Sequence, residues 1–163
     1  MSVHDRHISP PPAGGAAVGH LEEMPRIEAA IVCYLRMWCS GEDGRSELAL
    51  AFYDAGAADV AELMDQFSRL MRGLIDAARR PLQRRHMGCA LVSGDESAFA
   101  HFVAAAAVGE REDAMLLASH LVLPQAWLPM TMLAEEVGLD LARLHAAAPN
   151  YTHQPQQNPR KLN

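Results

Sequence analysis

The chain has little lysine, few aromatic residues and no long apolar run. Only Lys161 among its 14 basic residues is a lysine, and 6% of all residues are aromatic. The longest uninterrupted apolar run, Phe102 to Val108, is far shorter than the roughly 20 residues that span a bilayer. The chain has three cysteines, a small and odd number that argues against a framework of disulfides. The start lacks a basic segment followed by an apolar one, which predicts a cytoplasmic address.

What the sequence does contain is enough apolar material for one folded domain. Half of the 163 residues are apolar, 21% are charged and 28 are alanine. Residues 1–20 carry Pro10 to Pro12 and Gly14-Gly15 and are predicted to form a disordered leader. Residues 149–163, rich in proline and glutamine, are predicted to form a disordered tail. The predicted folded domain is therefore residues 21–148.

Within that domain the apolar residues recur at helical spacing. An example is the stripe formed by Ile27, Ala30, Ile31, Tyr34 and Trp38. Ser93-Gly94-Asp95-Glu96 matches a capping box and predicts a helix start. Capping signals and breakers predict the following helices: Pro25 to Ser40, Arg45 to Asp54, Asp59 to Ala78, Ser93 to Gly109, a central helix over Met115 to Leu123, Met132 to Gly138, and Leu139 to Ala147. No strand pattern competes with this assignment. The predicted fold is all-α, a single compact bundle of about five to seven helices.

One segment between two predicted helices has the residues of a metal site. His86 and Cys89 form an H-x-x-C pair with a glycine before the cysteine, a spacing that lets both side chains face one ion. Cys39, at a helix end, is the predicted third ligand, and His101, His120, water or a side chain of a partner could supply a fourth. Sulfur and nitrogen ligands favour zinc, with an iron–sulfur cluster as the weaker alternative. The simpler interpretation is a surface histidine beside a packed cysteine.

The same segment is rich in arginine. Residues 69–85 hold six arginines and a single acidic residue in a chain of net charge −6. Arg79, Arg80, Arg84 and Arg85 are predicted to bind an acidic partner protein, because guanidinium groups bind carboxylates in a bidentate manner. The sequence pI of about 5.7 disfavours a nucleic acid as that partner. The alternative is that these arginines offset the dipole at a helix C-terminus.

Short stretches of the chain also resemble a known group of proteins. They are Trp38-Cys39, Arg79 to Pro81, Arg85-His86 with Cys89, Gly94 to Glu96, and Gly109 to Ala114. Together they resemble a group of small, uncharacterised helical proteins of alphaproteobacteria, over most of residues 24–145. The resemblance implies a bacterial cytoplasmic setting and no particular activity. That group has a further cysteine where this chain has Leu91, a departure that weakens a complete metal site here.

These patterns lead to three hypotheses about function. The first is a small cytoplasmic regulator or adaptor, clamped by zinc and docking an acidic partner through its arginines. The second is a metal-free helical interaction module, which an alanine- and methionine-rich face could assemble into a homodimer. The third, a metal-dependent enzyme, has the least support because the sequence offers no general base near the metal ligands. Apart from a role as metal ligands, His101 is predicted to face solvent or a site formed by the neighbouring loop, and His120 to lie in the core.

Overall fold

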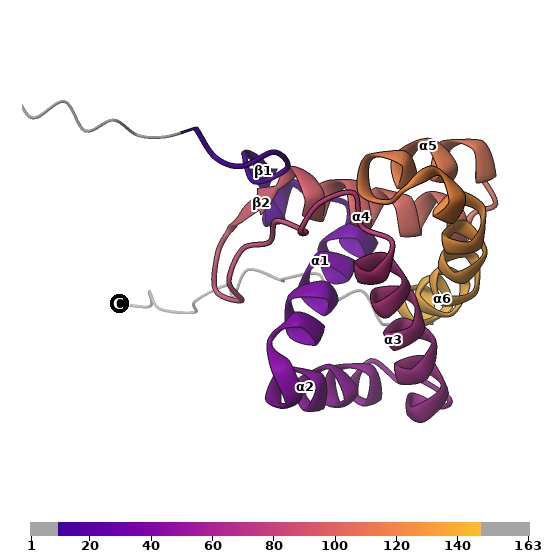
Figure 1. The fold of residues 1–163 in the computed structure, drawn as a ribbon. Helices are drawn as coiled ribbons and strands as arrows, with labels where there is room; N and C mark the ends of the chain where they lie inside the picture. Colours follow the sequence, from indigo (N-terminus) through magenta and orange to yellow (C-terminus); the bar gives the residue numbers. More distant parts are fainter. Residues whose placement is uncertain (1–9, 148–163) are drawn as a thin grey trace, which may run out of the picture.

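The computed structural model describes residues 10–147, and these form six α-helices and one small two-stranded sheet (Figure 1). The helices are α1 (Arg26–Cys39), α2 (Gly41–Asp54), α3 (Val60–Asp76), α4 (Gly94–Ala107), α5 (Arg111–Leu121) and α6 (Trp127–Ala147). The predicted all-α bundle of about five to seven helices is thereby confirmed as a mostly α-helical fold, to which the structure adds the small sheet. Among these helices none combines the length and the apolarity needed to cross a bilayer.

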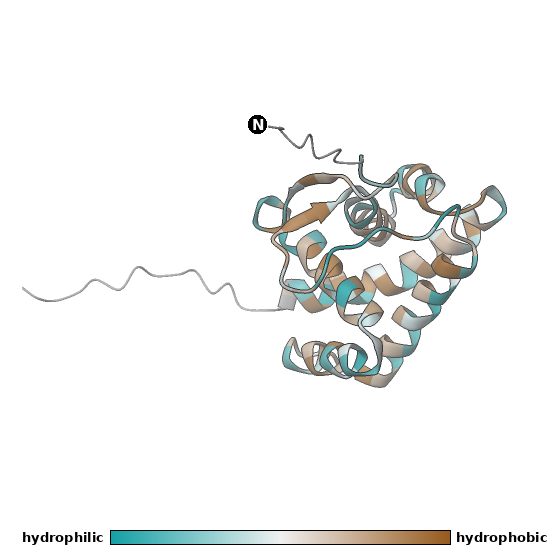
Figure 2. Cartoon of the chain, turned by 60° about the vertical axis from the view of Figure 1, so that its left-hand side comes forward, coloured by the Kyte–Doolittle hydropathy of each residue, from teal (hydrophilic) through white to brown (hydrophobic). Residues whose placement is uncertain are grey.

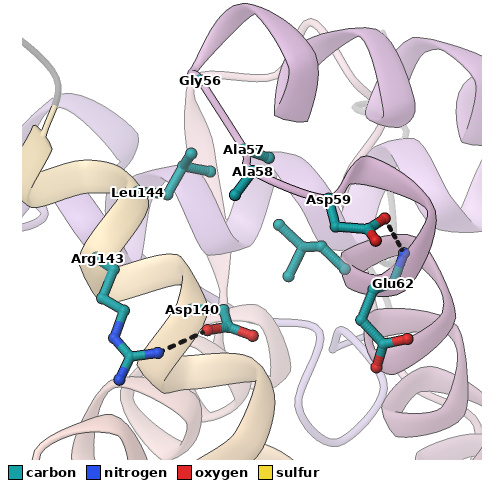
Figure 3. A pocket seen from close by; sticks show the side chains of 9 residues that line it. Gly56, Ala57, Ala58, Asp59, Glu62, Asp140, Arg143 and Leu144 are labelled. Carbon is teal, nitrogen blue, oxygen red and sulfur yellow. Dashed lines mark hydrogen bonds and ion pairs between the residues drawn. The ribbon is translucent and has the colours of Figure 1, made fainter.

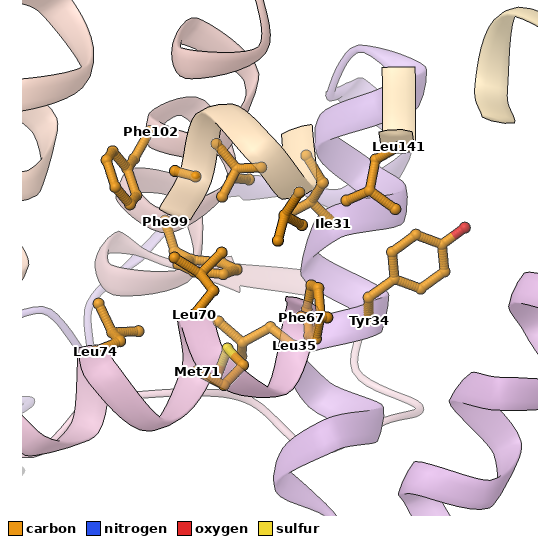
Figure 4. Close-up of a cluster of buried hydrophobic side chains, with 14 of the residues drawn as sticks. Ile31, Tyr34, Leu35, Phe67, Leu70, Met71, Leu74, Phe99, Phe102 and Leu141 are labelled. Carbon is orange, nitrogen blue, oxygen red and sulfur yellow. The ribbon is translucent and has the colours of Figure 1, made fainter. Parts of the chain in front are cut away.

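The core lies where α1, α3, α4 and α6 meet. The helices contribute side chains such as Leu35, Leu70, Phe99 and Leu141, none of which is accessible to solvent (Figure 4). Phe67 packs edge-to-face against Phe99, with ring centroids 6.5 Å apart. Burial of these large apolar groups supplies most of the driving force for folding. Figure 2 shows the matching pattern, with hydrophilic and hydrophobic residues alternating along each helix.

A short antiparallel sheet joins the N-terminal segment to the rest of the molecule. Strand β1 (Ala17–His20) pairs with β2 (Leu91–Ser93), with Ala17 opposite Ser93 and His20 opposite Leu91. The structure therefore differs from the expectation of a leader without structure at residues 17–20. The sequence contains no alternating pattern there because the strand is mostly exposed on both faces. The predicted tail, 149–163, lies outside the described residues.

The last helix is continuous, so the predicted division into Met132–Gly138 and Leu139–Ala147 is wrong. Helix α6 runs through Gly138 without a break. A Cβ atom at that position would lie 2.7 Å from the carbonyl oxygen of Val103 and 2.9 Å from the Cβ of Ala107. Gly138 is thus a point of close approach between α6 and α4, and the absence of a side chain there serves packing rather than helix termination.

The predicted central helix over Met115 to Leu123 is also wrong in its placement. Helix α5 packs against α4 and α6 through Ala114, Ala118 and Leu121. Leu116 on its opposite face is 64% exposed. The central helix is α4, which contacts α1, α5 and α6. The sequence of this helix is apolar nearly all round, a pattern typical of a helix that is buried on every side. In α5, however, the outer apolar residue Leu116 is exposed.

Candidate functional site

The four predicted partner-binding arginines, His86 and Cys89 lie on segment 77–93, which joins α3 to α4. Apart from strand β2 and a single bridge between Ala78 and Val122, this segment has no regular secondary structure. Its backbone is held by side chains from α1 and from the first turn of α4. Figure 1 shows it crossing the bundle from the end of α3 to β2.

The strongest of these anchors is a buried ion pair between Arg36 of α1 and Glu96 of α4. Nε and Nη2 of Arg36 donate to the two carboxylate oxygens of Glu96 at 2.8 and 3.0 Å, and neither side chain is exposed to solvent. Arg36 also donates to the carbonyl oxygens of Cys89 at 2.6 Å and Leu91 at 2.7 Å. The guanidinium therefore ties α4 and segment 77–93 to α1 by four hydrogen bonds. A buried charge is tolerated only with such complete pairing.

Glu96 also organises the start of its own helix. Its carboxylate accepts from the backbone amides of Ser93 at 2.9 Å and Arg85 at 2.8 Å, and Ser93 Oγ accepts from the Glu96 amide. The predicted capping box at Ser93 to Glu96 is thereby confirmed. Burial alone would raise the pKa of Glu96, but the hydrogen bonds from Arg36, Ser93 and Arg85 and the charge of Arg36 keep this pKa below its usual value.

A second ion pair fastens the same segment at Asp95. Both terminal nitrogens of Arg80 donate to the Asp95 carboxylate, at 2.6 and 2.8 Å, and the amide of Gln83 donates to it at 2.8 Å. Asp95 is buried, whereas the side chain of Arg80 is 35% exposed. Gly14 (φ +80°) lies over this pair, and a Cβ there would collide with the carboxylate. One of the four predicted partner-binding arginines is thus engaged inside the protein.

The other three arginines bind backbone carbonyl oxygens. Arg79 donates to Ser119 at 2.7 Å, Arg84 to Cys39 at 3.1 Å, and Arg85 to Gly15 at 2.8 Å. Ser119 and Cys39 lie in the last turns of α5 and α1, where carbonyl oxygens lack partners within the helix. None of these three arginines takes part in the ion pairs found among residues 10–147. Each is held in place while its positive charge stays without a carboxylate partner in that range.

The predicted metal ligands share one corner of the molecule. The amide of Cys89 donates to the carbonyl of His86 at 3.1 Å, which closes a turn, and Arg84 brings the segment against Cys39. Burial raises the pKa of the Cys39 thiol against the opposing charges of Arg84 and Arg45. His86 is exposed, and within residues 10–147 no three His, Cys, Asp or Glu side chains come together in a way that could hold a metal ion. The structure gathers these residues without assembling a ligand set.

The two candidate fourth ligands lie elsewhere. His101 is exposed on α4, as predicted, and its Nδ1 bonds to the carbonyl oxygen of Ser97 at 2.8 Å. His120 is exposed at the end of α5, so its prediction as a core residue is wrong. Helix α5 turns out to be peripheral, and position 120 lies on its outer side. Neither histidine approaches Cys39 or Cys89 in a metal-binding group within the described residues.

Two cavities outside this corner differ in whether the carboxylates that line them have hydrogen-bond or ion-pair partners within the described residues. One, of about 330 Å³, lies between the α2–α3 loop and α6. Its acidic residues are engaged: Asp59 accepts from the amide of Glu62 and Asp140 accepts from Arg143 (Figure 3). The carboxylate of Glu62 accepts from the side-chain amide of Gln66. The other, of about 500 Å³, runs along α4 between α1, α5 and α6 and is lined by Glu28, Glu110 and Asp113. We call this second cavity the α4 groove.

Sequence reasoning missed the two carboxylates that organise the corner, because it treated Asp95 and Glu96 only as helix-capping residues. A signal for the buried pair exists in the sequence. Arg36 stands alone in the otherwise apolar run Ile31 to Cys39, and an arginine in a buried stripe requires a carboxylate partner. The partner itself, 60 residues further along, is not specified by any local pattern.

Comparison of the chain with protein-family models, with curated proteins and with solved structures gave no match. The geometry of the chain itself therefore carries the functional argument.

Proposed function

We propose that the protein is a small cytoplasmic regulator or adaptor that binds an acidic segment of a partner protein along segment 77–93. The observation that supports this most is the arrangement of Arg79, Arg84 and Arg85. Each guanidinium is fixed by a neutral backbone carbonyl and keeps its full positive charge. On a chain of net charge −6, such a row of positive charges is a distinct local feature.

Fixed arginines are well suited to recognising carboxylates. A free arginine side chain loses about 2 kcal/mol of rotamer freedom when it is ordered, and a guanidinium that is already held loses less on binding. The nitrogen atoms of Arg79 and Arg84 that do not contact a carbonyl keep their N–H donors for a ligand, whereas Nε of Arg85 is buried and has no partner among the described residues. The rigid attachment of the segment through Asp95 and Glu96 keeps the arginines at a constant spacing. Specificity then follows from the spacing of carboxylates on the partner.

The experiment is a binding titration with a fluorescent decaglutamate peptide. We expect saturable binding that weakens as salt is added, because the contacts are largely ionic. The double variant R79Q/R84Q is expected to bind more than about tenfold more weakly, since charge-assisted hydrogen bonds contribute about 1.5–3 kcal/mol each.

The matched control is R69Q/R143Q. It removes the same two charges from arginines that already pair with Asp65 and Asp140. This control is expected to bind the peptide like the parent protein. Equal weakening in both double variants, or the absence of binding to the parent, would contradict the proposal.

A zinc-clamped form of the same regulator is the second candidate. The observation that favours it is that Cys39, His86 and Cys89 are drawn into one corner by the bonds from Arg84 and Arg36. Because structural zinc sites have four ligands, this form needs one ligand besides these three residues. The side chain of His86 would also have to rotate toward the two thiols. The test is elemental analysis of protein purified anaerobically without chelators, in which Cys89→Ser is expected to lose the zinc that the parent retains. Parent protein without metal rules this candidate out.

The alternative of a metal-free homodimer is favoured by one face of α6. Leu128, Met132 and Leu139 follow one another at helical spacing and are 49%, 58% and 43% exposed. A second copy of the chain is the proposed occupant. Light scattering at increasing protein concentration tests this alternative. Met132→Glu is expected to convert a dimer of the parent protein into a monomer. A parent protein that stays monomeric at every concentration would contradict the alternative.

A further inference from the structure

The α4 groove has an apolar floor of small side chains. His101, Ala104, Ala105 and Val108 follow the i, i+3, i+4, i+7 pattern on the outer face of α4. Figure 1 shows α4 between α1 and α5, and these neighbours supply the walls, among them Leu116. Leu116 is 64% exposed and Val108 is 70% exposed. The groove is thus open to solvent, has a mostly apolar lining and encloses a volume of about 500 Å³.

Carboxylates surround this apolar floor. Glu28 comes from α1, Asp113 from the first turn of α5, and Glu110 immediately precedes α5. The ion pairs found among residues 10–147 include none of these three carboxylates. Oε2 of Glu28 is buried and has no hydrogen-bond partner among the described residues. A buried carboxylate oxygen without a partner is costly, so a donor that reaches this oxygen would be stabilised there.

His101 adds an acceptor to the same groove. Its Nδ1 bonds to the carbonyl oxygen of Ser97, which can only accept, so Nδ1 carries the proton. In the neutral ring Nε2 is then an acceptor. The groove therefore combines carboxylate oxygens, a ring nitrogen acceptor and an apolar floor, and no arginine or lysine of residues 10–147 lines it.

We propose that the α4 groove binds a primary amine that carries an apolar chain or ring. The ammonium group would donate to Glu28, with Asp113 and His101 within the same groove, and the apolar part would cover the alanines of α4. Primary ammonium has three donors and a positive charge, which matches several acceptors of negative charge. This site is separate from the arginines of segment 77–93 and independent of the function proposed for them.

The size of the groove favours a small molecule over a docked helix. From position 101 to position 108 the floor extends about 10 Å along α4, which is only two helical turns. A volume of about 500 Å³ lies within the range of small-molecule sites.

The experiment compares octylamine, octanol and octanoate as probes of the full-length protein. The methyl resonances of Ala104 and Ala105 are followed by NMR, and binding is quantified by calorimetry. We expect saturable shifts with octylamine, at least tenfold weaker binding of octanol, and none of octanoate. Equal binding of amine and alcohol would overturn the proposal, as would saturable binding of a basic amphipathic peptide without any response to octylamine.

Substitutions then separate the groove from general attraction to an acidic protein. Glu28→Gln and Asp113→Asn are each expected to weaken octylamine binding about tenfold or more. Asp113 is exposed, so its variant keeps the test valid even if Glu28→Gln disturbs folding. Glu47→Gln, which removes an exposed charge on α2, is the matched control and is expected to bind like the parent. Octylamine binding that is unchanged in D113N and in a folded E28Q overturns the assignment.

Discussion

The guanidinium of Arg36 and the carboxylate of Glu96 form a fully buried pair joined by two hydrogen bonds of 2.8 and 3.0 Å. The pair links two helices that are distant in sequence and also positions the segment that carries the candidate functional residues. Stability and the presentation of the arginine segment therefore depend on the same two side chains.

The substitution Glu96→Gln tests this dependence. It keeps the size of the side chain but leaves the buried Arg36 without a counter-charge. We expect the free energy of unfolding to fall by about 3–5 kcal/mol, which is typical when one member of a buried pair is removed. Chemical denaturation provides the measurement. Glu135→Gln, which affects an exposed pair with Arg111, is the control and should change stability far less.

The substitution Asp95→Asn tests how the segment is held without altering the core. Asp95 accepts the backbone amide of Gln83 and both terminal nitrogens of Arg80. Loss of its charge is expected to speed hydrogen exchange at the Gln83 amide and cleavage by protease between residues 79 and 85. Exchange in the core of α3, for example at Leu70, should remain slow. Unchanged exchange at Gln83 would show that this carboxylate does not anchor the segment.

The fold was predictable where local signals and burial agree. The capping box at Ser93 and the apolar stripe from Ile27 to Trp38 both depend on residues close in sequence, and both are confirmed. Gly138 was misinterpreted as a helix end because a glycine that stops a helix and a glycine that permits close packing look alike in a sequence. The two roles are distinguished only by the folded structure, in which the carbonyl oxygen of Val103 lies too close to position 138 for a Cβ atom.

The candidate site was predictable only in its location. Segment 77–93 stands out by composition, yet the binding of Arg79 to α5 and of Arg84 to α1 depends on how separate helices end beside it. The interpretation that arginines offset a helix dipole fits Arg79 and Arg84, except that they serve helices α5 and α1 rather than the helix that precedes them. Such long-range pairings leave no periodic trace.

The substitution Gly138→Ala tests the close contact between α6 and α4. Alanine favours a helix by about 1 kcal/mol over glycine, but here its Cβ would meet backbone and Cβ atoms of α4 at 2.7 and 2.9 Å. We expect a net loss of about 1–3 kcal/mol in the free energy of unfolding. Gly73→Ala is the matched control, because its Cβ would meet the flexible end of Met130, which can move. G73A should be neutral or slightly stabilising. A gain of stability in G138A would refute the packing role of this glycine.

Tyr34 and His145 give the fold a dependence on pH. Tyr34 Oη and His145 Nε2 are 3.0 Å apart. Burial, with a further effect from the nearby thiol of Cys33, raises the pKa of Tyr34 to about 12. Burial, helped by the charge of Arg26, lowers the pKa of His145 below its ordinary value of 6.5. The folded protein therefore binds the histidine proton less readily than the unfolded chain does.

From this difference we expect the free energy of unfolding to decrease as the pH falls from about 6.5 through the lowered pKa of His145. Above that window His145 is neutral in both states and contributes no slope. Denaturation curves recorded at several pH values give the measurement, and His145→Gln is expected to flatten this part of the profile. Below it, the lowered pKa of Glu96 makes stability fall again as that carboxylate is protonated. A profile for H145Q that keeps the parent's slope near pH 6 would assign the effect to another group.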